Sequence, residues 1–485
     1  MTNYKVIAKI LGVIILIVGI GEIIPWIYAE VTEDVLTAAA FRICAPVTIG
    51  LGFALSFFIR ADKKKFGARE GFLVVACCWI VASLIGAFPY LMSGVADNYI
   101  DAFFESTTGF TTTGCSTIVG GLTNRSIILW KAISHWLGGM GILIFVISLL
   151  PALGVSGQII ARAEAPGPVL QKTRVRMSDS AKVLYLIYST FTVAEFILLA
   201  LSKKMSVYDA VITTLGSVST SGTLVPTEGI AYYDSLYVEL VVGFFCIMAS
   251  VNFVLYHYVT TGKPGYLIRD AEFRAYIIII ASAVAICTFG LVTVNGEPWT
   301  EALRNSFFQV ASFTSTTGYT ITPYLGWPAA CQMVLFTIMF IGGCAASTAG
   351  SLKVIRVLVL LKMIGRGCVR RIHPRSVVAV KIGKSAIPAP VVSNITVFIF
   401  TFIGILLLST LIISIQGLDL ETSLTSSLGL LSNTGAAFGE AASLGHFSFF
   451  HPAIKLWLSF LMIVGRLELF TVIILFTRNF WGKNK

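Results

Sequence analysis

The chain has 485 residues, of which 56% are hydrophobic and only 12% are charged, and its mean hydropathy is +0.86. Ordinary soluble domains carry about 25% charged residues, so this composition excludes a water-soluble globular protein and indicates a polytopic membrane protein. The net charge is +11 at pH 7, but the basic residues gather in alternate loops, which is typical of membrane topology and not of nucleic-acid binding.

The chain begins with an apolar stretch over residues 7–29 that contains Lys9 and Glu22. It lacks a small-residue cleavage site and is soon followed by a second apolar stretch, so we predict a retained transmembrane helix and not a signal peptide. These two spans form an N-terminal extension over residues 1–69. The next stretch, residues 71–96, contains no Asp, Glu, Lys or Arg and exceeds the ~20 residues that a membrane crossing requires.

Basic and acidic loops alternate along the chain. The basic segments are 60–69, 162–182, 263–274, 353–384 and 478–485, and the acidic ones are 30–34, 97–105, 297–301 and 419–440. The positive-inside rule makes the basic set cytoplasmic, and with it both termini. Lys203 and Lys204 depart from the pattern, because they are basic on the predicted outer side.

One polar segment recurs four times between apolar spans. The copies read DAFFESTTGFTTTG (101–114), DAVITTLGSVSTSG (209–222), NSFFQVASFTSTTG (305–318) and TSLTSSLGLLSNTG (422–435). The flanking spans are 71–94 and 127–150, 181–201 and 237–259, 276–294 and 334–361, and 395–415 and 454–476. Internal repeats of this kind define the architecture of a chain, here as repeats over residues 70–155, 178–262, 270–370 and 390–485.

Each polar segment is too short to cross the bilayer, so we expect it to enter from outside as a half-helix and to return as extended chain. Irregular backbone at that depth is tolerated only where it is buried in protein or lines a water-filled cavity. The predicted fold is therefore all-α and polytopic. It has ten full spans and four re-entrant half-helices around a central pore.

The ends of the half-helices predict the chemistry of that pore. Helix C-termini carry about half a negative charge each, and backbone oxygens beyond them can replace the hydration shell of a cation. Glycine permits the positive φ that such a carbonyl often needs. The predicted selectivity filter consists of Thr112, Thr113, Gly114, Thr220, Ser221, Gly222, Thr316, Thr317, Gly318, Asn433, Thr434 and Gly435. No acidic ring occupies these positions, which favours a monovalent, weakly hydrated ion.

A second candidate site lies in the third repeat, where small residues interrupt the second span. The interruption comprises Gly342, Gly343, Cys344, Ala345, Ala346, Ser347, Thr348, Ala349 and Gly350. A broken helix at membrane depth marks a transport pathway, although small residues also serve close helix packing. Arg466 lies in the middle of the last predicted span, where charge is costly and generally functional. Glu468 is its candidate partner, as a simple structural ion pair or as part of the pathway.

Two further polar groups leave alternatives open. Glu105 either faces the outer mouth or hydrogen-bonds behind the filter. His135 and His257 lie near span ends and are interpreted as interfacial or structural residues. The nine cysteines show neither metal-ligand spacing nor a secreted disulfide framework.

Taken in order, these motifs resemble the TrkH-type subunits of the Trk/Ktr/HKT superfamily of potassium transporters. The resemblance covers nearly the whole chain and includes HWLGGMGILIF (135–145), FIGGCAASTAGSLKVIR (340–356) and HPR (373–375). It implies K+ uptake through a K+-selective pore, with filter glycines at Gly114, Gly222, Gly318 and Gly435. It further implies that the third-repeat loop gates the pore from beneath the filter and that Arg466 lies against this loop as a positive barrier.

The same resemblance implies the surroundings of the chain. We expect a homodimer in the bacterial inner membrane, in which each protomer holds its own pore, on a cytosolic TrkA-like ring that binds the regulatory nucleotide. K+ in the filter is then the only ligand of this chain, with no covalent cofactor. Cys115 and Ala436 depart from the alanine and proline usual in the family, which leaves the order of preference among K+, Rb+ and Na+ open.

Two alternatives remain at this stage. The first is a Na+-permeable pore or a K+/cation symporter of the same fold. The second is an intramembrane hydrolase, which is disfavoured because a nucleophile needs one serine with one oriented base, whereas these serines recur in four equivalent places. The basic loop over residues 353–384 could dock a partner or bind anionic lipid.

Overall fold

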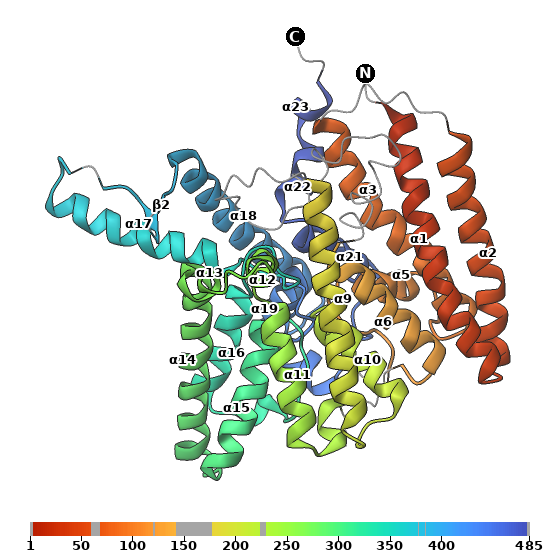
Figure 1. Ribbon diagram of the computed structural model, residues 1–485, viewed down its shortest axis with the longest axis horizontal. Coiled ribbons are helices and arrows are strands. Elements are labelled where there is room, and N and C mark those ends of the chain that lie inside the picture. Colours follow the sequence, from red (N-terminus) through yellow and green to blue (C-terminus); the bar gives the residue numbers. More distant parts are fainter. Residues whose placement is uncertain are drawn as a thin grey trace.

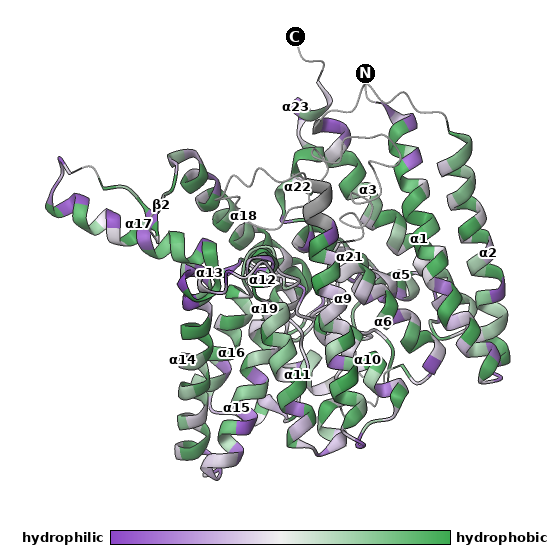
Figure 2. Cartoon of the chain, in the orientation of Figure 1, coloured by the Kyte–Doolittle hydropathy of each residue, from purple (hydrophilic) through white to green (hydrophobic). Residues whose placement is uncertain are grey.

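The computed structural model describes residues 3–59, 68–119, 122–141, 177–223, 229–376, 378–383 and 385–482. Over these ranges the chain is predominantly helical, and the one exception among regular elements is a two-residue antiparallel pair, β1 (Lys381–Ile382) with β2 (Ser385–Ala386). The long helices run roughly side by side (Figure 1), and most of their residues are apolar (Figure 2). The chain is thus a helical, multi-pass membrane protein, as predicted.

Two long helices, α1 (Tyr4–Val31) and α2 (Val35–Phe58), form the N-terminal extension. They pack along each other, and α1 also contacts α3 and α6 of the remaining structure. Glycine makes the close approach possible, because a Cβ atom at Gly12 would overlap Leu55 and one at Gly52 would overlap the backbone of Leu16. The extension is therefore joined tightly to the rest of the chain.

Four successive sets of helices follow, each with a first helix, a short helix and a second helix. The first helices are α3 (Ala68–Gly86), α9 (Met177–Leu201), α14 (Ala271–Val294) and α18 (Ala389–Ser414). The short helices are α5 (Tyr99–Phe110), α10 (Val207–Val218), α15 (Trp299–Thr314) and α19 (Leu420–Leu431). The second helices are α6 (Arg125–Gly139), α11 (Leu236–Ala249), α16 (Ala329–Ile341) and α21 (Pro452–Arg466).

Shorter elements connect these sets. They are α4 (Phe88–Met92), η1 (Gly229–Tyr233), α12 (Phe253–Thr260), α13 (Gly265–Arg269), η2 (Tyr324–Gly326), α17 (Val354–Ile372), α20 (Glu440–Leu444), α22 (Phe470–Ile473), η3 (Ile474–Phe476) and α23 (Arg478–Trp481). Side chains cap three of the four short helices: Asn98, Ser206 and Asp419 accept hydrogen bonds from amides of the first turn of α5, α10 and α19. Such caps fix where a helix starts.

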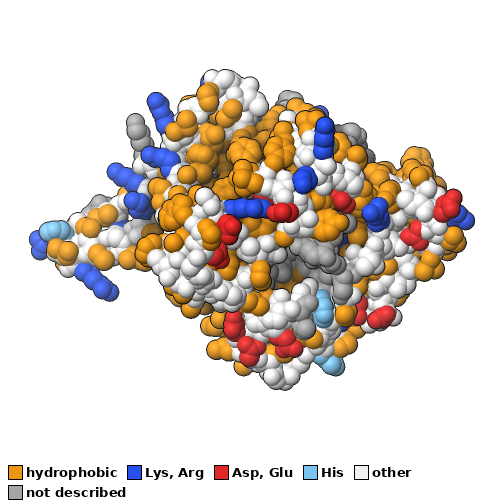
Figure 3. All heavy atoms as spheres, turned by 90° about the horizontal axis from the view of Figure 1, so that it is seen from below, with side chains coloured by type: hydrophobic (Ala, Val, Ile, Leu, Met, Phe, Trp, Pro, Cys, Tyr) orange, Lys and Arg blue, Asp and Glu red, His pale blue; other side chains and the backbone are white. Residues whose placement is uncertain are grey.

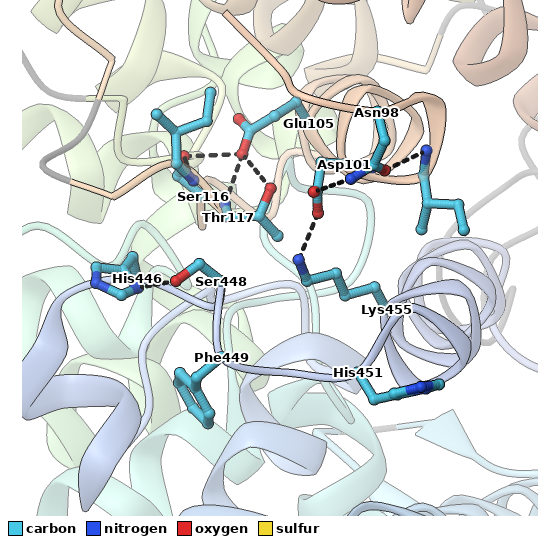
Figure 4. Close-up of polar contacts among 12 residues, drawn as sticks. Asn98, Asp101, Glu105, Ser116, Thr117, His446, Ser448, Phe449, His451 and Lys455 are labelled. Carbon is cyan, nitrogen blue, oxygen red and sulfur yellow. Dashed lines mark hydrogen bonds and ion pairs between the residues drawn. The ribbon is translucent and has the colours of Figure 1, made fainter.

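The four sets close into a ring. The second helix of each set packs on the short helix of the next, as α6 on α10, α11 on α15, α16 on α19 and α21 on α5. Two of these junctions carry an ion pair. Arg304 on α15 binds Glu239 on α11 through both carboxylate oxygens, at 2.5 and 2.6 Å, and Lys455 on α21 binds Asp101 on α5 at 2.5 Å (Figure 4).

The bidentate pair at the junction of the second and third sets gives a stability prediction. Arg304→Ala is expected to lower the free energy of unfolding by about 2 kcal/mol, because the carboxylate of Glu239 would be left without its charged donor. The side chain of Glu239 is only 4% exposed. A thermal melt in detergent measures the loss. Arg42→Ala removes an exposed ion pair with Glu30 and should leave the midpoint unchanged; equal losses in both variants would contradict the prediction.

The second helices end earlier than the sequence predicts. The stretches over residues 237–259 and 454–476, each predicted as one span, contain a sharp bend: the chain turns by 96° between α11 and α12 and by 111° after α21. Asn252 caps a new helix at Phe253, and Glu468 and Leu469 adopt positive φ, at 53° and 56°, which an α-helix cannot contain. The structure describes the predicted span 127–150 only as far as residue 141.

The described part of the chain contains fewer helices that could span a membrane than the ten spans predicted. Six helices are long and apolar enough to cross a membrane, or eight if each bent pair is one span. The predicted ten also include residues 127–150, which are only partly described, and 334–361, which the structure divides into α16 and α17.

Both ends of the chain lie at the same end of the molecule (Figure 1). The amide of Asn3 donates to Glu70 Oε1 at 3.3 Å, and the neighbouring Arg69 donates to the carbonyl of Gly482 at 2.8 Å. The opposite face shows acidic and basic side chains among many apolar ones (Figure 3). Residues of α3 therefore hold both ends of the chain together.

Candidate ion pathway

All four short helices end in the same backbone motif. After α5, the amide of Thr113 donates to the carbonyl of Thr108 at 3.0 Å and that of Thr112 donates to Gly109 at 3.1 Å, which are the two bonds of a Schellman motif. The equivalent bonds in the other sets are Ser221 to Gly216 and Thr220 to Ser217, Thr317 to Ser312 and Thr316 to Phe313, and Thr434 to Gly429 and Asn433 to Leu430.

The predicted filter triplets begin within this motif and share an unusual backbone. The first residue of each triplet has positive φ: 55° at Thr112, 56° at Thr220, 61° at Thr316 and 55° at Asn433. The closing glycines have φ of 82°, 73°, 81° and 69° at Gly114, Gly222, Gly318 and Gly435. A left-handed threonine is strained and persists only where its surroundings impose the conformation, a situation that clusters at functional sites.

A pair of hydroxyl groups holds each triplet from behind. The C-cap residue of the short helix hydrogen-bonds to the middle residue of the triplet, as in Thr111 with Thr113 at 2.8 Å. The same bond recurs as Ser219–Ser221 at 2.9 Å, Ser315–Thr317 at 2.7 Å and Ser432–Thr434 at 2.7 Å. The middle side chains are thereby bound within the protein, which leaves the backbone oxygens as the free ligands. The C-cap hydroxyls were not predicted as site residues, although the Ser or Thr two positions before each middle residue was visible in the repeats.

The four triplets meet in a closed ring. A Cβ atom added to Gly114 would overlap the carbonyl oxygen of Ser221, and the same relation links Gly222 to Thr317. It continues from Gly318 to Thr434 and from Gly435 back to Thr113. Each triplet therefore lies against the next, in chain order, and the last lies against the first. The ring is lined by backbone and admits no side chain at its four glycines.

Two polar side chains support this ring from behind. Glu105 is fully buried and accepts hydrogen bonds from Ser116 and Thr117, just beyond Gly114, so of the two alternatives it lies behind the triplet and not at the outer mouth. His135, interpreted from sequence as interfacial or structural, is also fully buried. Its Nδ1 lies within hydrogen-bonding distance of the hydroxyls of Ser221 and Thr223.

An irregular loop over residues 342–353 separates α16 from α17. Three of its contacts go to the second set: the amide of Cys344 donates to the carbonyl of Ser250, the hydroxyl of Thr348 donates to that of Ala249, and the carbonyl of Ala346 accepts from the amide of Phe253, all at 2.8–3.0 Å. A fourth contact stays within its own set, where the amide of Ala345 donates to Glu272 on α14 at 2.7 Å. The loop therefore fills the break between α11 and α12.

The far end of this loop touches the triplets. The amide of Gly350 donates to the side-chain hydroxyl of Thr316 at 2.9 Å, and a Cβ atom at Gly350 would overlap the carbonyl oxygen of Ser432. Ser432 directly precedes the fourth triplet. The loop thus lies against the inner ends of the third and fourth triplets.

Arg466, the last residue of α21, joins this loop to the first set. Its guanidinium donates to the carbonyl of Thr348 at 2.8 Å and to those of Gly138 and Gly139 at 2.6 and 2.7 Å. The latter two belong to the C-terminal end of α6, where a positive charge is favourable. The predicted partnership of Arg466 with Glu468 is wrong, because the turn after α21 directs Glu468 to Arg356 on α17.

The chain is similar over nearly its whole length to known cation transport proteins. A family model described as "TrkH: Cation transport protein" matches residues 38–483. The Trk system potassium uptake protein TrkH of Escherichia coli K12 is 34% identical, and the alignment covers 99% of both chains. The protein of the same name from Halomonas elongata is 32% identical, over 99% of this chain and 100% of that protein. The crystal structure of the potassium transporter TrkH from Vibrio parahaemolyticus superimposes with a TM-score of 0.87 at 30% identity, over 99% and 100% of the two chains.

Proposed function

The chain belongs to the TrkH family of cation transport proteins, and from this premise we propose that it takes up K+ through a pore formed by its own four sets of helices. The family comprises transporters and not enzymes, so the hydrolase alternative is dropped. Relatives named as potassium uptake proteins support K+ as the transported ion.

The ring of triplets is the observation that carries the proposal. Four backbone carbonyls, those of Thr113, Ser221, Thr317 and Thr434, lie against the glycines of neighbouring triplets. A ring of this kind can replace the hydration shell of K+, and cation selectivity in pores depends on the size of such a ring and the number of its carbonyls. The C-terminal ends of four short helices add partial negative charge, and the membrane potential drives entry with about 2.3 kcal/mol per charge per 100 mV.

The loop over residues 342–353 and Arg466 form the proposed gate. The loop contacts Thr316 at the inner end of the ring, and the guanidinium of Arg466 is bound to the loop at Thr348. Because a cation leaving the ring would meet this segment and its positive charge, flux requires the loop to move. The Glu272 carboxylate, which accepts from the amides of Ala345 and Ile355 at 2.7 and 3.1 Å, would hold both ends of the loop in the closed state.

The remaining features of the assembly are part of the proposal. We place the chain in the bacterial inner membrane with both termini on the cytoplasmic side. The basic loops predicted for that side and the common location of the two chain ends (Figure 1) support this placement. The proposed protein has ten spans, forms a homodimer and rests on a cytosolic TrkA-like ring that binds the regulatory nucleotide. The words "Trk system" in the names of its relatives support an association with other components.

Uptake of 86Rb+ into liposomes that contain the purified chain tests the transport function. Under an imposed inside-negative potential, uptake should follow the potential and should be inhibited by external K+ far more strongly than by Na+ or Li+. Equal inhibition by Na+ would favour the Na+-permeable alternative. Uptake that depends on a Na+ or H+ gradient would favour a symporter. No uptake, with or without the partner ring, would contradict the proposal.

A further inference from the structure

Directly behind the first triplet lies a buried ion pair. Lys131 on α6 is 2% exposed and Glu105 on α5 is fully buried, with Lys131 Nζ 2.7 Å from Glu105 Oε2. An ion pair so far from water is stable only where its geometry is good and further hydrogen bonds satisfy the remaining polar atoms. The residues that form these further hydrogen bonds therefore show which part of the structure the ion pair holds in place.

All of these bonds go to the three residues that follow Gly114. Lys131 Nζ donates to the carbonyl of Cys115 at 2.9 Å. Glu105 Oε1 accepts from the hydroxyl of Ser116 at 2.8 Å, the amide of Thr117 at 2.6 Å and the hydroxyl of Thr117 at 3.2 Å (Figure 4). The ion pair thus holds the backbone just beyond the first triplet. Lys131 is the charged donor to the carbonyl of Cys115, and Glu105 is the charged acceptor from the amide of Thr117.

The other sets have neutral residues at the equivalent positions, and two of these side chains, Gln309 and Ser426, make no hydrogen bond to the described residues. The positions equivalent to Glu105 are Thr213, Gln309 and Ser426. Beyond the fourth triplet, the amide of Phe438 donates to the hydroxyl of Thr425 at 2.9 Å, and the carbonyl of Ala437 accepts from Tyr324 at 2.5 Å. Charge-assisted hydrogen bonds are shorter and roughly twice as strong as neutral ones. The first triplet is therefore held more firmly than the fourth.

We propose that the Glu105–Lys131 ion pair is a positioning device that fixes the first triplet at the spacing that favours K+ over Na+. The inference rests on the proposed function, because it assumes that the ring binds K+. A ring that can contract around a smaller ion loses its preference, so a triplet with a rigid outer end preserves the K+-sized ring. Neither residue touches the ion; both act through the backbone of residues 115–117.

Ion-dependent thermal stability of the purified chain tests this role without requiring transport. An ion that binds the native state raises the unfolding midpoint, so the parent should melt at a higher temperature in K+ than in Na+. Lys131→Met and Glu105→Gln are each expected to lower the preference for K+ over Na+ by about tenfold, equivalent to about 1.4 kcal/mol, and so to remove most of the difference between the two salts. Competition of K+ and Na+ with 86Rb+ uptake should show the same loss.

The double variant Glu105→Gln with Lys131→Met guards against misfolding of the single variants, because it leaves no unpaired buried charge. It is also expected to lose the K+ preference. Asp101→Asn with Lys455→Met is the matched control: it removes an ion pair of the same short helix, 2.5 Å long, which makes no bond to residues 112–117. This control should retain the parent's difference between K+ and Na+.

The outcomes separate this inference from the proposed function. If the parent prefers K+ and the Glu105 and Lys131 variants retain that preference, or if the control loses it to the same extent, the ion pair has no specific role and the inference is overturned while the proposed function stands. If the parent itself shows no difference between K+ and Na+ in either measurement, both are overturned.

Discussion

Gly114→Ser is expected to reduce K+ influx by roughly 100-fold, which corresponds to about 2.7 kcal/mol, and to raise Na+ flux relative to K+ flux. The new Cβ atom would overlap the carbonyl oxygen of Ser221 in the next triplet, and the φ of 82° is unfavourable for any residue with a side chain. The ring must therefore open, and the fixed carbonyl spacing on which K+ selection depends is lost. Parallel uptake of 86Rb+ and 22Na+ into proteoliposomes measures both changes.

Gly404→Ser is the matched control, because a Cβ atom at Gly404 on α18 meets no other atom within 4 Å. This variant should conduct like the parent. An unchanged ratio of Rb+ to Na+ uptake in Gly114→Ser, at equal incorporation into the liposomes, would remove Gly114 from the ion-binding ring.

Arg466→Gln is expected to raise the flux that passes in the absence of any regulatory partner by about 30-fold. A unit positive charge about 8 Å from a passing cation raises its energy by about 2 kcal/mol at an effective dielectric constant of 20. Glutamine removes this barrier, and its single NH2 group replaces the guanidinium that binds the carbonyls of Thr348, Gly138 and Gly139. Because fewer of these bonds can form, the variant should also release the loop over residues 342–353. Uptake of 86Rb+ by the isolated chain measures the effect.

Arg466→Lys separates the charge from the hydrogen bonds. Lysine retains the positive charge but lacks the planar fork that bridges several carbonyls, so basal flux should stay closer to that of the parent than in Arg466→Gln. A basal flux in Arg466→Gln at or below that of the parent would indicate that the arginine supports the fold and does not restrain the pore.

The sequence was sufficient to predict the helical multi-pass fold and that the four triplets would meet. The four triplets could be located because they recur in register between apolar spans, and hydrophobicity and repetition are properties of the sequence alone. The interruption after α16 was visible for a related reason: residues 342–351 contain three glycines together with serines and a threonine, and these residues lower helix propensity.

Contacts between sets could not be predicted in the same way. Lys131 was not predicted as a site residue, since its partner Glu105 lies on another helix and no periodicity connects the two. Arg466 and Glu468 are close in sequence and suggested a pair, but the left-handed backbone at Glu468 turns the carboxylate toward Arg356. The bends after α11 and α21 were missed because each whole stretch is apolar enough to pass as one span. Asn252 and Glu468 lie at these breaks, but a single polar residue in an apolar stretch does not by itself predict a bend.

A structure of the protein grown in Rb+ and recorded at the rubidium absorption edge would test the central claim most directly. The account predicts an anomalous difference peak on the axis of the ring, surrounded by the carbonyl oxygens of Thr113, Ser221, Thr317 and Thr434, which weakens when Na+ replaces Rb+. Absence of a peak inside the ring, with Rb+ bound elsewhere in the chain, would contradict the assignment of these triplets as the ion-binding site.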